Sequence, residues 1–322
     1  MQATMNNHII HLKHCYIDNP QAIWNVSYYG VDYELKFTHE TFDEGKIIII
    51  RSEIGFIDSN TFLSWLSVFF GEDCTDPFQR QDTRSSFNRG KLQASQKLLQ
   101  DFLNAAFLKE ENIPTDRDKI LFRQTMNYYL AGLRSGISMM PLTIGFFGLS
   151  MECVGNLVSD QNSEYHTLGS FAFEKLINKS FEPFKKDREH GKNYRTWQKY
   201  IKIDSKLVHF IRNAVYGHSL LHIPDERQKL VKNLHQWLKM AGASDKDAEF
   251  WFKAERLEID FQTHAPGLYK IGLRSARLLI FLYLGIIDSI PFTEHDYHPF
   301  GEFPKNQTMK FNGMSISISI VN

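Results

Sequence analysis

The stretch from Val208 to His218 combines three side chains that suit chemistry on a phosphate group. Arg212 is followed directly by Asn213, and His218 lies six residues beyond the arginine. An arginine fork binds phosphate oxygens well, and a histidine with a pKa of about 6.5 can accept or supply a proton at cellular pH. We therefore take Arg212, Asn213 and His218 as the candidate catalytic residues.

A helix has to position these side chains. Leu207, Ile211 and Val215 recur every four residues, which predicts a helix with one face packed into the protein. At about 100° per residue, Arg212 and His218 would lie about 120° apart around such a helix. The two side chains would then flank a cleft, unless Gly217 loosens the helix and lets His218 turn inward.

Arg212, Asn213 and His218 resemble the arginine–polar–x(3–5)–histidine motif of the HEPN family. The segment from Gly148 to Asn156, which contains Glu152, is similar to the glutamate-bearing helix common in these proteins. The resemblance implies a helical bundle over about residues 115–290 and a metal-independent endoribonuclease. It also implies RNA as the substrate and a homodimer with a composite site. A toxin or an anti-phage defence effector, with an antitoxin or another defence-system protein as partner, is the biological role it suggests.

The chemistry expected of the motif is transesterification, in which an RNA 2′-hydroxyl attacks the adjacent phosphate without a metal or an activated water. The histidine would move the proton and the arginine would stabilise charge on the phosphate. A second hypothesis is a non-catalytic HEPN-like module that binds RNA or nucleotide, or another protein. Arg212 and Asn213 would then be a surface ion pair and a helix-end amide, and His218 a buried bundle histidine.

Lys270, Arg274 and Arg277 recur at helical spacing and form a basic stripe. The stripe is interpreted either as an RNA-binding track or as a solvated face. His218 and His222 have the spacing of two helical metal ligands, but no carboxylate or cysteine ligand lies near them in the sequence. The segment His295–His298 is another conceivable metal site. The prediction is nevertheless that the protein uses no metal or other cofactor.

Familiar catalytic signatures are missing from the sequence: it has no glycine-rich phosphate loop, no GxSxG segment and no HExxH segment. Basic and acidic residues number 37 each, so RNA would have to bind a local patch rather than the protein at large. Three widely spaced cysteines indicate reduced thiols and a cytoplasmic protein. The apolar segment 135–151 is short and contains Pro141, which favours a buried helix over a membrane span.

The elements predict an α+β fold. Alternating residues in Trp24–Tyr28 and Tyr33–Phe37 indicate a hairpin, and the isoleucines of Lys46–Arg51 indicate a further strand. A helix is expected over Asn60–Gly71, and a polar linker over Glu72–Lys91.

The rest of the chain reads as helical from Leu92 to about Ile290, with a capping box at Thr115–Asp118. Alternating isoleucines after Ser315 predict a C-terminal strand that pairs with the N-terminal sheet. The expected organisation is a β-rich domain with its linker over 1–91, a helical bundle over 92–290, and a loop and strand over 291–322.

Overall fold

The computed structural model describes residues 8–12, 22–41, 44–51, 59–75, 95–140, 142–159, 170–182, 252–253, 258–259, 261–286, 308–311 and 314–317, and also 198, 201, 204, 205, 208, 209, 211 and 212. The described part is mainly helical, with antiparallel strands at its N-terminal end. The helices are α1 (Ser59–Phe70), α2 (Gln96–Glu111), α3 (Asp116–Ser135), the 3₁₀ turn η1 (Ile137–Met139), α4 (Leu142–Val158), α5 (Ser170–Phe181) and α9 (Phe261–Leu284). The strands are β1 (His8–Leu12), β2 (Ile23–Tyr28), β3 (Val31–Thr41), β4 (Glu44–Arg51), β5 (Phe252–Lys253), β6 (Glu258–Ile259), β7 (Thr308–Phe311) and β8 (Met314–Ser317).

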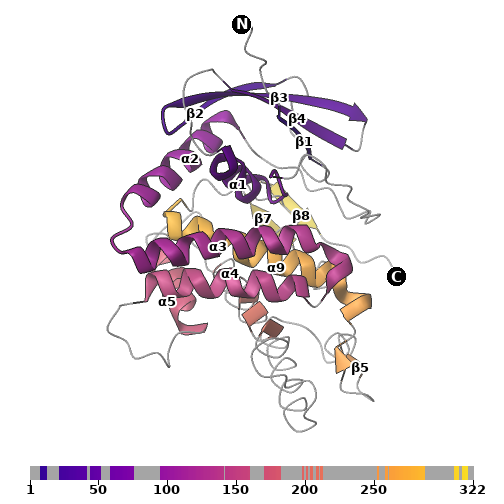
Figure 1. Cartoon of the computed structure of the whole chain (residues 1–322). Helices are drawn as coiled ribbons and strands as arrows, with labels where there is room; N and C mark the ends of the chain where they lie inside the picture. The colour runs from indigo at the N-terminus through magenta and orange to yellow at the C-terminus, as the bar shows by residue number, and fades with distance from the viewer. Residues whose placement is uncertain are drawn as a thin grey trace, which may run out of the picture.

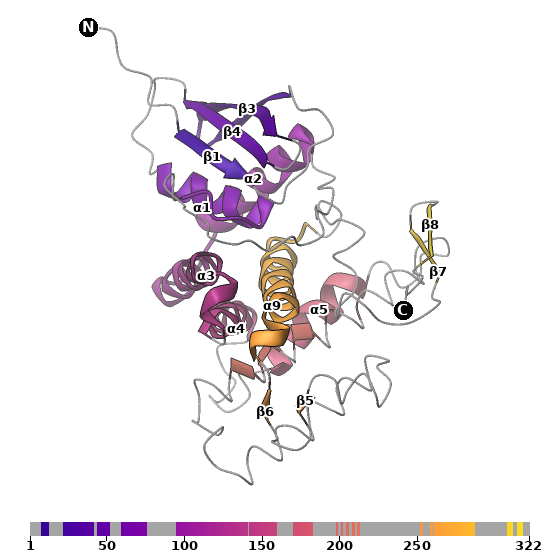
Figure 2. The same cartoon turned by 90° about the vertical axis from the view of Figure 1, so that its right-hand side faces the viewer.

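The elements form three layers. An antiparallel sheet in the order β1-β4-β3-β2 covers α1 and α2, and the group formed by α3, α4 and α9 lies beyond them (Figure 1). Figure 2 shows α1 between the sheet and this helical group, with α9 beside α3 and α4. Buried apolar side chains from the sheet and from both helical layers form one continuous core.

The predicted hairpin is confirmed by β2 and β3. Its two-residue turn, Tyr29–Gly30, has positive φ at both positions, which matches the right-handed twist of the strands it joins. Trp24 pairs with Leu35 across the hairpin, and the inward side chains of both strands are buried. The isoleucine strand is also confirmed, as β4.

Helix α1 confirms the next prediction. Gly71 follows its last residue with φ of +74°, the left-handed conformation that commonly ends a helix. The expected polar linker begins differently, because Glu72, Asp73 and Cys74 are buried directly after this glycine. Residues 76–91 of the linker lie outside the described part.

Helix α2 packs against the sheet as well as against the other helices. The Gln100 side chain donates to the Ser27 carbonyl at 2.9 Å and accepts from the Ser27 backbone N–H at 2.8 Å. Glu110 accepts hydrogen bonds from the Tyr28 hydroxyl and the Trp65 indole, at 2.6 and 3.1 Å. These contacts cross the domain boundary that the sequence suggested at residue 92.

The three-helix group follows the sequence pattern closely. The Thr115 side chain accepts a hydrogen bond from the Asp118 backbone N–H at 3.1 Å, as the capping motif predicts. One apolar face of α3 is buried, and α4 begins directly after Pro141 and ends at Val158. Gly132 of α3 and Gly272 of α9 make room for the Phe147 ring of α4. A Cβ added at either glycine would lie only 2.6 Å or 2.7 Å, respectively, from a ring carbon.

Several boundaries differ from the predictions. Helix α9 begins at Phe261, within the region expected to be helical, and contains Pro266. The pair β5–β6 interrupts a region expected to be helical. In the described part of the C-terminal region, β8 pairs with β7 and not with the N-terminal sheet. No described helix is long and apolar enough to span a membrane.

Candidate functional site

The structure describes one of the three predicted catalytic residues. Arg212 is helical, as are the other described residues between 201 and 212. Val208 and Ile211 are fully buried, whereas Leu207 and Val215, the other residues of the predicted apolar face, lie outside the described residues. Asn213 and His218 lie outside the described residues.

Arg212 lies against α4 at Gly148. A side-chain carbon added at Gly148 would come within 2.6 Å of Cβ and 2.8 Å of Cγ of Arg212. Such distances are well below van der Waals contact, so the arginine stem passes directly over the glycine backbone. The helix that contains Arg212 therefore approaches α4 closely at this point.

Glu152 forms an ion pair with the guanidinium of Arg212. It lies one helical turn beyond Gly148, and its Oε2 forms an ion pair with Nη2 of Arg212. The Arg212 side chain is 19% exposed and that of Glu152 is 27% exposed. The pair is thus sheltered but still in contact with solvent, which is where a charged side chain can remain ionised and still reach a ligand.

Two further titratable groups lie close to this pair. Burial, and then the charge of Arg212, lower the pKa of His209 to about 4, so this histidine is neutral at neutral pH. Burial, and then Glu152, raise the pKa of Cys153 to about 11, against an opposing effect of Arg212. Cys153 is therefore a protonated thiol that behaves as a core residue and not as a nucleophile.

The predicted RNA-binding stripe on α9 is wrong for its two described side chains. Arg277 is buried, and its Nε donates to the Val68 carbonyl at 2.7 Å while its Nη2 donates to the Phe69 carbonyl. These carbonyls lie in the last turn of α1, where no backbone N–H of the helix can reach them, so Arg277 caps that helix from α9.

Arg274 is also turned inward. Its Nη2 forms an ion pair with Asp204, whose side chain is 3% exposed. Burial raises the pKa of Asp204 to about 6, although the charge of Arg274 opposes the shift. Asp204 is therefore held to α9, and Arg212 is held to α4. The side chain of the third stripe residue, Lys270, lies outside the described residues.

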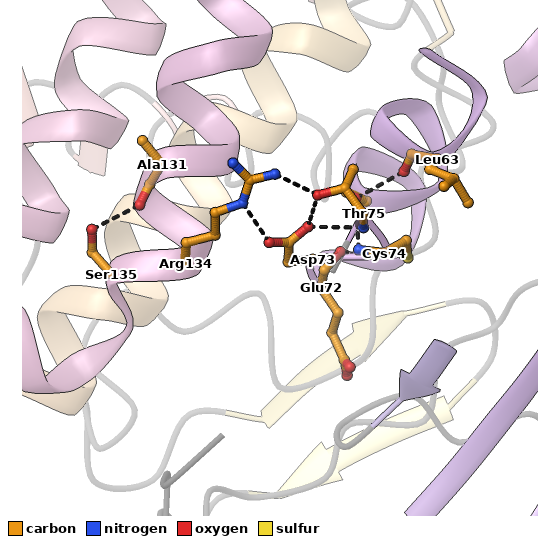
Figure 3. A network of polar contacts seen from close by, with 9 residues as sticks. Leu63, Glu72, Asp73, Cys74, Thr75, Ala131, Arg134 and Ser135 are labelled. Atoms are coloured by element: carbon orange, nitrogen blue, oxygen red, sulfur yellow. Dashed lines mark hydrogen bonds and ion pairs between the residues drawn. The ribbon is translucent and has the colours of Figure 1, made fainter. Parts of the chain in front are cut away.

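A polar network that the sequence did not predict joins the segment after α1 to α3. Arg134 Nε donates to Asp73 Oδ2 at 2.8 Å, and a second nitrogen of the same side chain donates to the Thr75 hydroxyl (Figure 3). Asp73 also accepts from the Thr75 backbone N–H at 2.9 Å. The Glu72 side chain points away from this network in Figure 3.

This network is explained by structure alone. The aspartate side chain is 1% exposed, and its ion pair with Arg134 offsets part of the cost of burying it. Sequence reasoning missed it because Glu72–Thr75 look like the start of a polar linker. Gly71 could have indicated this arrangement. It ends α1 by changing the direction of the chain, and the residues directly after it are buried.

The metal hypotheses of the sequence fall on His218, His222 and His295–His298, which all lie outside the described residues. Among the residues that are described, no three histidine, cysteine or carboxylate side chains gather as metal ligands would. Comparison with known protein families, curated proteins and solved structures finds no match for this chain. Evidence for a function therefore comes from the sequence motif and from the contacts of Arg212.

Proposed function

We propose that this chain is a metal-independent endoribonuclease of HEPN type, with Arg212, Asn213 and His218 as its catalytic residues. The observation that supports the proposal most is the ion pair between Arg212 and Glu152. It joins the two segments on which the family resemblance rests, although they are sixty residues apart in the sequence. A chance match of either segment would give no reason for them to meet.

The proposed reaction is an internal transesterification. The RNA 2′-oxygen forms a bond to the adjacent phosphorus, and the bond from phosphorus to the 5′-oxygen breaks. One histidine accepts the proton of the 2′-hydroxyl, and a protonated histidine supplies one to the departing 5′-oxygen. Arg212 stabilises the charge that develops on the phosphate oxygens, and Asn213 orients the neighbouring groups through its amide.

A homodimer follows from this chemistry. Each chain supplies one motif and therefore one motif histidine, whereas the reaction needs a proton acceptor and a proton donor. Two protomers facing each other across a shared cleft would supply both. Light scattering at concentrations where the protein is active should then give twice the mass of the chain, and a strictly monomeric active species would contradict the composite site.

The test of the function is RNA cleavage in EDTA. We expect the purified protein to cut mixed RNA and leave 2′,3′-cyclic phosphate ends. Arg212→Ala and His218→Ala should each lower the rate by about 10²–10⁴-fold, and Asn213→Ala by less. His222→Ala is the matched control, because it removes the same chemical group outside the motif.

The outcomes separate the hypotheses. If folded parent protein never cleaves RNA, the non-catalytic HEPN-like binding module becomes the better explanation. If His222→Ala were as damaging as His218→Ala in a folded protein, a metal pair would replace the proposed mechanism. A cytoplasmic toxin or defence effector, controlled by an antitoxin or another defence protein, is the role that we propose for an active enzyme.

A further inference from the structure

We infer that Gly148 is a positioning residue for Arg212: the absence of a side chain there lets the arginine lie on α4 with its guanidinium against Glu152. Gly148 and Glu152 are called the arginine seat below. The effect of the seat on catalysis rests on the proposed function. Its effect on the guanidinium rests only on the contacts of Arg212.

The contacts at Gly148 involve the base of the arginine side chain. An added Cβ would lie 2.6 Å from Arg212 Cβ, 2.8 Å from its Cγ and 3.6 Å from the Val208 carbonyl oxygen. The outer part of a long side chain, from Cγ onward, can rotate aside, but the position of Cβ is fixed by the backbone, so Arg212 Cβ moves only if the helix backbone moves. An alanine would therefore push the whole arginine away from α4.

Such a displacement would disturb the ion pair between Arg212 and Glu152. Residues four apart lie on the same face of a helix, so the arginine stem crosses at Gly148 and its head reaches Glu152 one turn later. A guanidinium held at both ends of its side chain has lost its rotational freedom before any substrate arrives. An ordered group costs less entropy when it engages a reacting phosphate.

Two other glycines, Gly132 and Gly272, make equally close contacts but only with an apolar side chain. Carbons added at Gly132 and Gly272 would meet the Phe147 ring at 2.6 Å and 2.7 Å, which is as severe as the contact at Gly148. Those glycines accommodate an apolar core ring, whereas Gly148 accommodates a charged side chain that is still partly exposed. Gly132→Ala is therefore a matched steric control for Gly148→Ala, with Gly272→Ala as its replacement if it fails to fold.

The first experiment measures the guanidinium directly. Phenylglyoxal modifies accessible arginines, and mass spectrometry of the full-length protein after digestion gives the rate at Arg212. We expect that rate to rise several-fold in Gly148→Ala and in Glu152→Gln, which keeps the shape of the side chain and removes its charge. It should stay at the parent value in Gly132→Ala. Parent-like protection of Arg212 in either seat variant would overturn the inference.

The second experiment measures catalysis. A misplacement of about 1 Å can lower a rate on the order of 10²-fold, so Gly148→Ala should lose kcat by about that factor. KM should change less than kcat, because the proposed role of Arg212 is to stabilise charge that develops only in the transition state. Gly132→Ala, corrected for its folded fraction, should keep the parent kcat.

The two failures can be told apart. Parent-like kcat in folded Gly148→Ala, with an active parent enzyme, would refute a positioning role. If the parent enzyme does not cleave RNA at all, the proposed function fails, and the phenylglyoxal rates alone decide whether Gly148 and Glu152 seat the arginine. If Gly148→Ala does not fold, Glu152→Gln decides it by the same two measurements.

Discussion

Replacing Arg277 by methionine separates a structural role from an RNA-binding role. The substitution would leave the Val68 and Phe69 carbonyls without their buried donor at the end of α1. An unsatisfied buried polar group costs about 1–3 kcal/mol, and loss of a cation near a helix C-terminus adds about 0.3–1 kcal/mol. Relief from burying a charge offsets part of this cost. We therefore expect the free energy of unfolding to fall by about 3 kcal/mol.

Urea unfolding followed by tryptophan fluorescence would measure the change, since Trp65 is fully buried in α1 itself. Arg277→Lys should recover only part of the loss, because an ammonium lacks the planar fork that reaches two carbonyls. Arg123→Met on the exposed face of α3 is the control and should change stability by less than about 0.5 kcal/mol. The reasoning would be refuted if Arg277→Met unfolded at the parent urea concentration while RNA binding weakened.

Three further predictions concern other buried polar groups. Glu110→Gln should lower the free energy of unfolding by about 2 kcal/mol in the same urea assay, because glutamine has one acceptor oxygen where Glu110 uses two, one for Tyr28 and one for Trp65. Because burial raises the pKa of Asp204 to about 6, its contribution to stability is present below about pH 4 and is lost as the pH rises through about 6. Asp204→Asn should therefore remove this fall in the free energy of unfolding, measured from pH 4 to 7. The lowered pKa of His209 acts in the opposite sense, since its contribution to stability is present above about pH 6.5 and is lost as the pH falls towards 4. In His209→Gln the free energy of unfolding should therefore fall less between pH 6.5 and pH 4 than it does in the parent.

The local signals in the sequence were sufficient for most elements. The β2–β3 hairpin, the glycine after α1 and the Thr115 cap depend on residues within a few positions of one another, and all three are confirmed. The placement of α2 against the sheet depends on Gln100 and Glu110 meeting partners 45 to 82 residues earlier. Spacing along one helix contains no information about such a partner.

The basic stripe on α9 was misread for a related reason. Its spacing correctly places three cations on one helix, but it does not say which faces are covered. The residues from Leu278 to Leu282 are all buried, so α9 is enclosed on every side there. An arginine beside such a run is expected to be buried and paired, and that signal was already present in the sequence.

Arg212 was the better candidate, and the difference from Arg277 is physical. Arg277 is 7% exposed and bonded to backbone carbonyls, which cannot move to water if a phosphate takes the arginine. The partner of Arg212 is the side chain of Glu152, which is 27% exposed and can be hydrated when the arginine engages another anion. Exchange of a carboxylate for a phosphate therefore costs far less at Arg212. Of the arginines singled out from the sequence and described in the structure, Arg212 is the most exposed, which is what the proposed role requires.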